Sequence, residues 1–283
     1  MSKTVHNAPL KGDSMSYSLE EIRVLAKREP FRAGVRMRYV MPRISVRVTR
    51  WILHHLPKVT PNQLTLVSGV LGVAAGAFLL FPRGIAPAVA AALVYQLHIL
   101  FDYVDGEVAR VKQLTSPLGA YYDLMVGRLV KPVVIYSAVI GTWLGTKDPA
   151  DAPRDLLLGT LILLGFFLDK EAVDVWYRAN AGRSDIEDPY VVQSDRPVKG
   201  LRRRVARALV GLRGIQALLV YQVIASVVTT LGVRTVHLGR TETTLRGVVL
   251  MAYAVAFPSV ALVRSVIIAR TGHIPRRQDL VGG

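Results

Sequence analysis

Residues 85–123 read IAPAVAAALVYQLHILFDYVDGEVARVKQLTSPLGAYYD, and this stretch decides the fold. An apolar run comes first and ends in two acidic residues, Asp102 and Asp105. A short basic connection then leads into a second apolar segment, which begins near Pro117. Acidic side chains at membrane depth cost free energy and usually serve a function. The stretch therefore predicts two membrane helices that meet at a polar, functional end.

The composition of the whole chain is typical of a membrane protein. Hydrophobic residues make up 51% of the 283 residues, and 36 Lys and Arg against 20 Asp and Glu give a net charge of +16. The mean hydropathy is +0.34. A chain that is both apolar and basic fits a lipid environment in which the cations stay at the water interface. The absence of cysteine excludes disulfide scaffolds, thiol nucleophiles and cysteine zinc sites.

Six apolar segments predict an all-α fold with six transmembrane helices. A helix needs about 20 residues to span a bilayer, so the second, third and fourth segments cross only if their polar ends project beyond the hydrocarbon. Thr60 is a suitable cap for the first helix, with Pro61 at the first helical position. The expected segments are residues 60–81, 85–100 with a continuation over 102–110, 117–144, 155–175, 215–233 and 247–268.

Basic residues alternate between the connections. Twelve Lys and Arg precede Thr60, ten lie from Lys170 to Arg213, and the first connection carries only Arg83. Because cytoplasmic segments of membrane proteins are enriched in Lys and Arg, we expect the N-terminus to be cytoplasmic. Nucleic-acid binding would not require this alternation, so no nucleic-acid partner is expected.

The N-terminal region predicts an amphipathic helix that lies on the membrane surface. Arginines are dense from Arg32 to Arg50, apolar residues separate them, and Trp51 follows. A helix of this kind lies in the headgroup layer, although a solvated charged helix is the alternative. The expected organisation is a cytoplasmic N-terminal region over 1–59, a membrane domain over 60–270 and a cytoplasmic tail over 271–283.

Small and acidic residues share faces on the second and third predicted membrane helices. Helical neighbours are three or four residues apart, so each set below lies on one face. The first set is Asp102, Asp105, Gly106 and Ala109, and the second is Gly119, Asp123 and Gly127. A short connection between the helices can bring the two faces together at the cytoplasmic edge.

Three clustered carboxylates require a compensating cation. Hard oxygen ligands without cysteine favour Mg²⁺ or Mn²⁺, and such an ion suits phosphoryl transfer. The alternative is a structural ion network with Arg110, Arg128 and Lys131. The histidines His54, His55 and His98 lack metal-like spacing and are expected to pack at the interface.

At this point the residues resemble a known family. The pattern from Asp102 to Arg110, eight further residues, and then Gly119 to Asp123 resembles the signature of CDP-alcohol phosphotransferases. That signature is D-x-x-D-G-x-x-A-R, eight residues, and G-x-x-x-D-x-x-x-D. The stretch TPNQLT at 60–65 also resembles the opening of the first membrane helix of this family, and the resemblance covers roughly residues 40–270.

The resemblance implies a reaction. Family members bind a CDP-linked donor on the cytoplasmic side, transfer a phosphatidyl or phosphoalcohol group to the hydroxyl of a lipid or polar alcohol acceptor, and release CMP. By resemblance, the divalent metal would be held by Asp102, Asp105 and Asp123. The nucleotide would be bound by Asp105, Gly106, Ala109, Arg110, Gly119 and, more weakly, Asn62, with Arg110 near the donor phosphates or bracing the loop. A homodimer surrounded by membrane lipids is expected on the same ground.

One signature position departs from the pattern. Gly127 stands where the family has its last aspartate, which is the proposed general base and also helps to bind metal. Glycine can do neither, so either the base is lost or reassigned, or the residue serves a tight helix crossing. By the same resemblance, Asp123 would be the remaining candidate for a catalytic carboxylate on this helix. Candidate groups for an anionic acceptor are Arg128, Lys131, Arg196 and Lys199, which could equally be positive-inside anchors that touch anionic lipid.

Two other functions compete with an active transferase. A catalytically impaired relative would bind nucleotide or lipid without turnover, and Gly127 is the feature that favours it. A transporter would place acidic residues deep within several spans, whereas here they gather at one edge of two helices.

Overall fold

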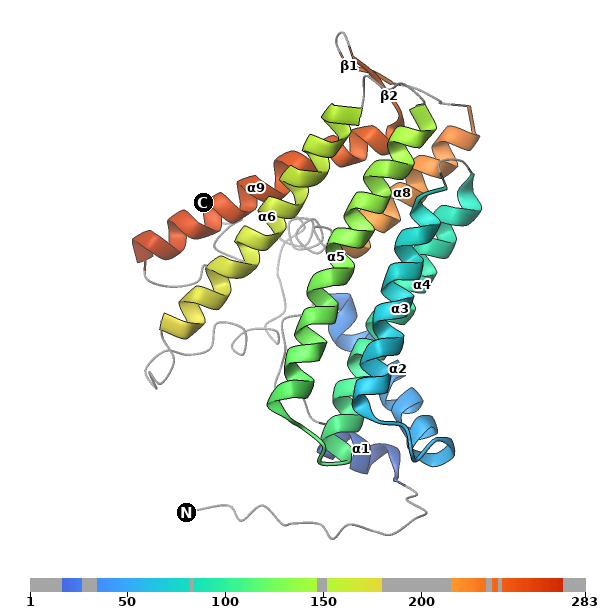
Figure 1. Ribbon diagram of the computed structural model, residues 1–283, viewed down its shortest axis with the longest axis vertical. Helices are drawn as coiled ribbons and strands as arrows, with labels where there is room; N and C mark the ends of the chain where they lie inside the picture. Colours follow the sequence, from blue (N-terminus) through green and yellow to red (C-terminus); the bar gives the residue numbers. More distant parts are fainter. Residues whose placement is uncertain are drawn as a thin grey trace, which may run out of the picture.

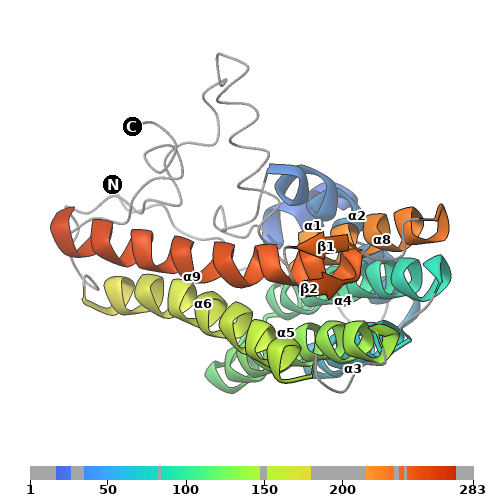
Figure 2. The same cartoon turned by 90° about the horizontal axis from the view of Figure 1, so that it is seen from above.

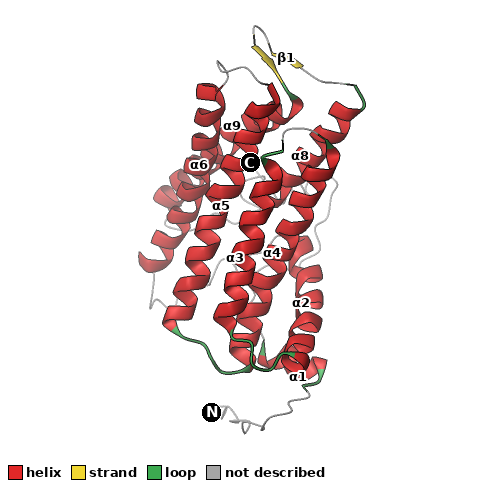
Figure 3. Ribbon diagram, turned by 45° about the vertical axis from the view of Figure 1, so that its right-hand side comes forward, coloured by secondary structure: helices red, strands yellow, loops and turns green. Residues whose placement is uncertain are grey.

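The computed structural model describes residues 17–26, 35–81, 84–146, 152–179, 215–232, 236–238 and 241–271. Helices dominate these ranges, and most run along the long axis of the molecule (Figures 1 and 3). The helices are α1 (Leu19–Leu25), α2 (Val35–His55), α3 (Pro61–Leu79), α4 (Ile85–Val111), α5 (Pro117–Thr146), α6 (Ala152–Ala179), α8 (Ile215–Thr230) and α9 (Leu245–Thr271).

Four of the described helices are long and apolar enough to cross a membrane. These are α3, α4, α5 and the part of α9 that runs from Leu245 to Val263. Two of the six expected spans do not reach this standard within the described ranges. The longest uncharged run in α6 is residues 156–168, and the apolar part of α8, Leu218–Thr230, is also short. The structure therefore supports an integral membrane protein with four candidate spans.

A β-hairpin between two of the helices departs from the expected all-α fold. Strand β1 (Val236–Leu238) pairs antiparallel with β2 (Thr241–Thr243), with Val236 opposite Thr243. Threonine and valine favour strands because their branched side chains suit a pleated surface. The hairpin lies between α8 and α9, at the end of the bundle opposite α1 (Figure 1).

Two helix starts follow from local capping. The Thr60 hydroxyl accepts a hydrogen bond from the Gln63 amide, and the Gln63 side chain accepts one from the Thr60 amide. Pro61 occupies the first helical position, where no amide hydrogen is needed. This capping confirms the predicted start of the first membrane helix. Ser18 and Glu21 form the same reciprocal pair at the start of α1.

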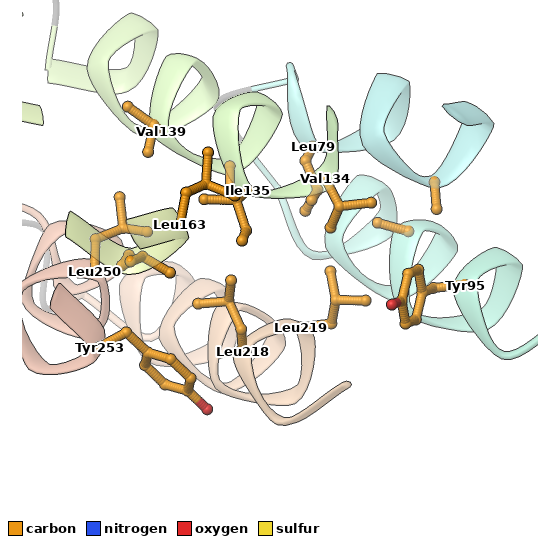
Figure 4. Close-up of a cluster of buried hydrophobic side chains, with 14 of the residues drawn as sticks. Leu79, Tyr95, Val134, Ile135, Val139, Leu163, Leu218, Leu219, Leu250 and Tyr253 are labelled. Atoms are coloured by element: carbon orange, nitrogen blue, oxygen red, sulfur yellow. The ribbon is translucent and has the colours of Figure 1, made fainter. Parts of the chain in front are cut away.

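The core consists of two apolar clusters. The larger joins α3, α4, α5, α6, α8 and α9, and Figure 4 shows Ile135, Leu218 and Leu250 among its buried members. The smaller joins α1 and α2 to α3 and α4. Figure 2 places α1 and α2 together on one side of the bundle, while α6 and α9 run side by side. The N-terminal helices are thus packed onto the helices that carry the signature.

Glycines allow α3 to approach α5 closely. A Cβ atom on Gly72 would lie 2.5 Å from a methyl of Val130, and one on Gly76 would lie 3.0 Å from a methyl of Val133. Small residues at such positions let membrane helices pack backbone against side chain. The crossing fixes the position of α5 relative to α3, and with it the position of Asp123.

We expect Gly72→Ala to lower the free energy of unfolding by about 1–3 kcal/mol, since the new methyl overpacks a buried valine. Thermal unfolding of the purified protein in detergent measures the change. Gly127→Ala is the matched control, because the nearest described neighbour of its Cβ would be the end of the Lys131 side chain, at 4.0 Å. An equal loss in both variants would show that the α3–α5 crossing is not tight at Gly72.

Candidate active site

The acidic site is built at the C-terminal end of α4. Asp105 is buried, with 3% of its surface exposed, and the Thr65 hydroxyl of α3 donates a hydrogen bond of 2.6 Å to its Oδ2. Asp102 lies one turn earlier on α4 and is half-buried. Thr65 was not among the expected site residues, because no spacing rule connects it to α4. It anchors the central carboxylate of the signature.

The third carboxylate comes from α5. Asp123 is half-buried, and its charge and that of Asp102 both act on Asp105. The fold thus places Asp102 and Asp123 near enough to Asp105 for their charges to act on it. Within the described residues, however, no three His, Asp or Glu side chains stand close enough together to form a ready metal site.

Two of the predicted nucleotide-site residues meet at the starts of α3 and α5. A Cβ atom on Gly119 would lie 3.5 Å from the Asn62 Oδ1 and 3.1 Å from the Ser116 Oγ. The Ser116 hydroxyl also accepts a hydrogen bond of 3.0 Å from the Gly119 amide. Gly119 therefore keeps a small space open beside the exposed amide side chain of Asn62.

The face of α4 at Gly106 is covered by Arg110. A Cβ atom on Gly106 would lie 3.2 Å from the Arg110 Nη1, so glycine leaves room for this guanidinium. The Arg110 Nε donates a hydrogen bond of 3.2 Å to the Ala26 carbonyl, at the end of α1. Ala109 beside it is half-buried. In this arrangement Arg110 braces the N-terminal segment against the signature helix.

The connection before α3 is tied to the end of α4 as well. The Lys112 ammonium donates hydrogen bonds of 2.6 Å and 2.7 Å to the carbonyls of Pro57 and Val59. Burial lowers the pKa of this ammonium group. These bonds hold the segment that leads to Asn62 beside the signature helix.

Gly127 does not lie at a tight crossing of the described helices. Among the described residues, the nearest neighbour of a Cβ atom there would be the Lys131 Nζ, at 4.0 Å. The Lys131 ammonium also lies 5.2 Å from the centroid of the Phe166 ring. The described residues therefore give no support to the packing explanation, and they leave room for the Cβ of an aspartate. Arg128 is half-buried, and Arg196 and Lys199 lie outside the described residues.

A buried polar pair lies one turn deeper along α4 than Asp102. His98 is 5% exposed, and its Nδ1 lies 2.8 Å from the Ser68 Oγ and 2.9 Å from the Ser68 carbonyl oxygen. The Ser68 hydroxyl also lies 3.0 Å from the His98 carbonyl. The expectation that His98 packs at the interface is wrong, since Ser68 of α3 gives it a buried partner. The sequence hints at the contact between His98 and Ser68 only through the position of the histidine, which precedes Asp102 by four residues, or about one helical turn.

Known proteins are similar in sequence to this region of the chain. Residues 58–183 match the family model described as CDP-alcohol phosphatidyltransferase. The chain is 37% identical over 97 residues to the bifunctional IPC transferase and DIPP synthase of Thermococcus kodakarensis. It is 38% identical over 107 residues to the phosphatidylinositol phosphate synthase of Corynebacterium glutamicum. These matches cover 34% and 38% of this chain, and 21% and 46% of the respective relatives.

A solved structure is also similar, that of phosphatidylinositol phosphate synthase from Mycobacterium tuberculosis with CDP-DAG bound. It is 20% identical, with a TM-score of 0.48, over 81% of this chain and 94% of that one. The family-model match spans α3, α4 and α5, so it contains the three carboxylates and both signature glycines of the site. Residues 58–183 of the chain are thus similar to the CDP-alcohol phosphatidyltransferase family.

Proposed function

We propose that this protein is a membrane transferase that moves a phosphatidyl or phosphoalcohol group from a CDP-linked donor to an acceptor hydroxyl and releases CMP. The observation that carries the proposal is the buried carboxylate Asp105 of α4, which Thr65 anchors and on which the charges of Asp102 and Asp123 act. The family match over these helices supports the same reaction.

The donor set fits a divalent cation by its chemistry. Asp102, Asp105 and Asp123 would hold Mg²⁺ or Mn²⁺, since such ions prefer carboxylate oxygens and substrate phosphates. When bound, the ion would neutralise charge on the donor pyrophosphate. Thr65 fixes Oδ2 of Asp105, so the orientation of that carboxylate is set before any ligand arrives.

The remaining signature residues would bind and orient the donor. Gly119 and Asn62 bound a small polar space at the starts of α5 and α3, and we assign it to the nucleotide. Gly106, Ala109 and Arg110 would form its other wall. The acceptor hydroxyl attacks the phosphorus distal to the cytidine, and the bond to the CMP oxygen breaks. With glycine at 127, Asp123 is the carboxylate on α5 that could take the hydroxyl proton.

We assign a phosphorylated polyol as the leading acceptor class. The similar phosphatidylinositol phosphate synthase is named after a product that contains a phosphorylated polyol. The Lys131 ammonium lies close to the open space at Gly127, where it would attract an anionic acceptor, and Arg128 follows that glycine directly. Arg196 and Lys199 would contribute from the basic connection.

The finer topology belongs to the same proposal. We propose six spans, with α6 and α8 crossing through their short uncharged parts, and an N-terminus and site on the cytoplasmic side. The distribution of Lys and Arg supports this orientation. Under it, α2 lies in the headgroup layer, with the membrane domain over 60–270, a cytoplasmic tail after it, and a homodimer as the assembled form.

A second candidate function is a family member that binds the donor but turns over poorly. Gly127 favours it, because general-base catalysis typically contributes about 10²–10⁴-fold to a rate. Donor binding without CMP release, across a panel of acceptors, would identify this case.

Removal of divalent metal is expected to stop the reaction. The purified protein in lipid vesicles is incubated with CDP-diacylglycerol or a CDP-alcohol and a panel of acceptors, and CMP release is measured. EDTA should reduce release to background, and excess Mg²⁺ or Mn²⁺ should restore it, because three carboxylates need a cation to admit a pyrophosphate. Release that continues unchanged in EDTA would contradict the metal assignment.

A further inference from the structure

A buried glutamate lies inside the signature, at a position the signature leaves open. Glu107 is 5% exposed. The Ser45 hydroxyl donates a hydrogen bond of 2.5 Å to its Oε1, and the Thr49 hydroxyl donates one of 2.6 Å to its Oε2. Both donors come from α2 and are themselves fully buried. A carboxylate is rarely buried unless its oxygens are bonded in this way.

The two donors are placed by the helical repeat of α2. Ser45 and Thr49 are four residues apart and share the face that packs on α4, beside the buried Ile52 and Leu53. The opposite face carries the exposed Arg47. The sequence of α2 thus provides two hydroxyls, one for each carboxylate oxygen.

The contact restrains α4 on the side opposite its catalytic face. Successive helical residues are about 100° apart around the axis, so Glu107 points roughly away from Asp105. Thr65 of α3 holds Asp105, while α2 holds Glu107 within the same turn. Two restraints on opposite sides fix the rotation of the helix about its axis. Arg110, one turn further along, adds its bond to the Ala26 carbonyl.

We propose that Glu107 is a positioning residue, through which α2 sets the rotation of α4 and so the aim of Asp102 and Asp105. This inference rests on the proposed transferase function. It also gives α2 a part in the reaction, although α2 lies before the residues 58–183 that match the family model.

Glu107→Ala and Thr49→Val test the inference in the full chain in vesicles. We expect each to lower kcat for CMP release by about 10–100-fold, as for other groups that orient catalytic ligands, with little change in the donor KM. Glu107→Gln should recover most of the loss, since its amide can still bond both hydroxyls.

Thr142→Val is the matched control. Thr142 is 2% exposed, but its hydroxyl donates to the Ala138 carbonyl of its own helix, so the variant loses a buried hydroxyl without losing an interhelical bond. Its kcat should equal that of the wild type. An equal fall in kcat for Thr142→Val and Thr49→Val, or an unchanged kcat in Glu107→Ala and Thr49→Val, would overturn the proposal.

Hydrogen exchange without substrate separates this inference from the proposed function. Amides of residues 102–111 should exchange faster in Thr49→Val than in Thr142→Val, because α4 has lost a restraint. If the wild type releases no CMP, the proposed function fails and the exchange measurement alone decides the role of Glu107. Equal exchange in the two variants would then overturn it, and Glu107→Gln serves if Glu107→Ala does not fold.

Discussion

Asp105→Asn is expected to reduce CMP release by about 10³-fold or more, the scale of losing a central electrostatic group in an active site. The substitution keeps the size of the side chain and a carbonyl oxygen that can accept from Thr65. What it removes is the negative charge at the most buried of the three site carboxylates. Initial rates of CMP release at saturating Mg²⁺ measure the effect.

Asp155→Asn provides a matched control for this loss of charge. Asp155 is 1% exposed and pairs with Arg154 at 2.9 Å, in the first turn of α6. That turn follows the C-terminal end of α5, whereas the site adjoins the N-terminal end, and α5 is about 45 Å long for its 30 residues. The control should lower thermal stability but keep wild-type turnover. Comparable turnover in Asp105→Asn and the wild type would refute the role of Asp105.

Gly127→Asp is expected to raise CMP release by about 10²–10⁴-fold, because it would supply the carboxylate that the signature has at this position and that we expect to act as a general base. Within the described part of the chain, the Cβ of this side chain would meet only the Lys131 Nζ, at 4.0 Å, so there is room for it. That ammonium would favour the ionised carboxylate. Rates measured with a neutral and a phosphorylated acceptor should show the larger gain with the neutral one.

Gly127→Asn distinguishes a base from a space-filling effect. Asparagine has nearly the same shape as aspartate but cannot take a proton, so it should leave the rate at the wild-type level. A gain of the same size in both variants would mean that packing at position 127, rather than proton transfer, limits the reaction.

Much of the fold follows from hydrophobic periodicity and caps. The start of α3 at Pro61 could be predicted, because it depends on the cap residues next to it in the sequence. Whether the two shorter apolar segments, in α6 and α8, cross the membrane was harder to predict. Charges at Asp155 and Asp169 leave α6 with an uncharged stretch below spanning length, and sequence counting cannot say how such a helix is placed.

The contacts between distant helices were beyond prediction from one sequence. Thr65 bonds to Asp105 across 40 positions, and Ser45 to Glu107 across 62. Serine and threonine in apolar helices commonly bond their own backbone, so nothing marks the few that reach a neighbour. The sequence also cannot show whether a neighbouring helix packs against Gly127, and the fold shows no close contact there among the described residues.

The central claim is that the chain transfers a phosphate-linked group to an acceptor, and isotopic labelling tests it most directly. CDP-diacylglycerol or a CDP-alcohol, labelled with ³²P at the phosphorus distal to the cytidine, is incubated with the purified protein, Mg²⁺ and a panel of alcohol, polyol-phosphate and lipid-alcohol acceptors. We predict that the label appears in a new phospholipid and that unlabelled CMP is released. Label recovered as phosphatidic acid or inorganic phosphate, or left entirely in the donor with every acceptor, would contradict the account.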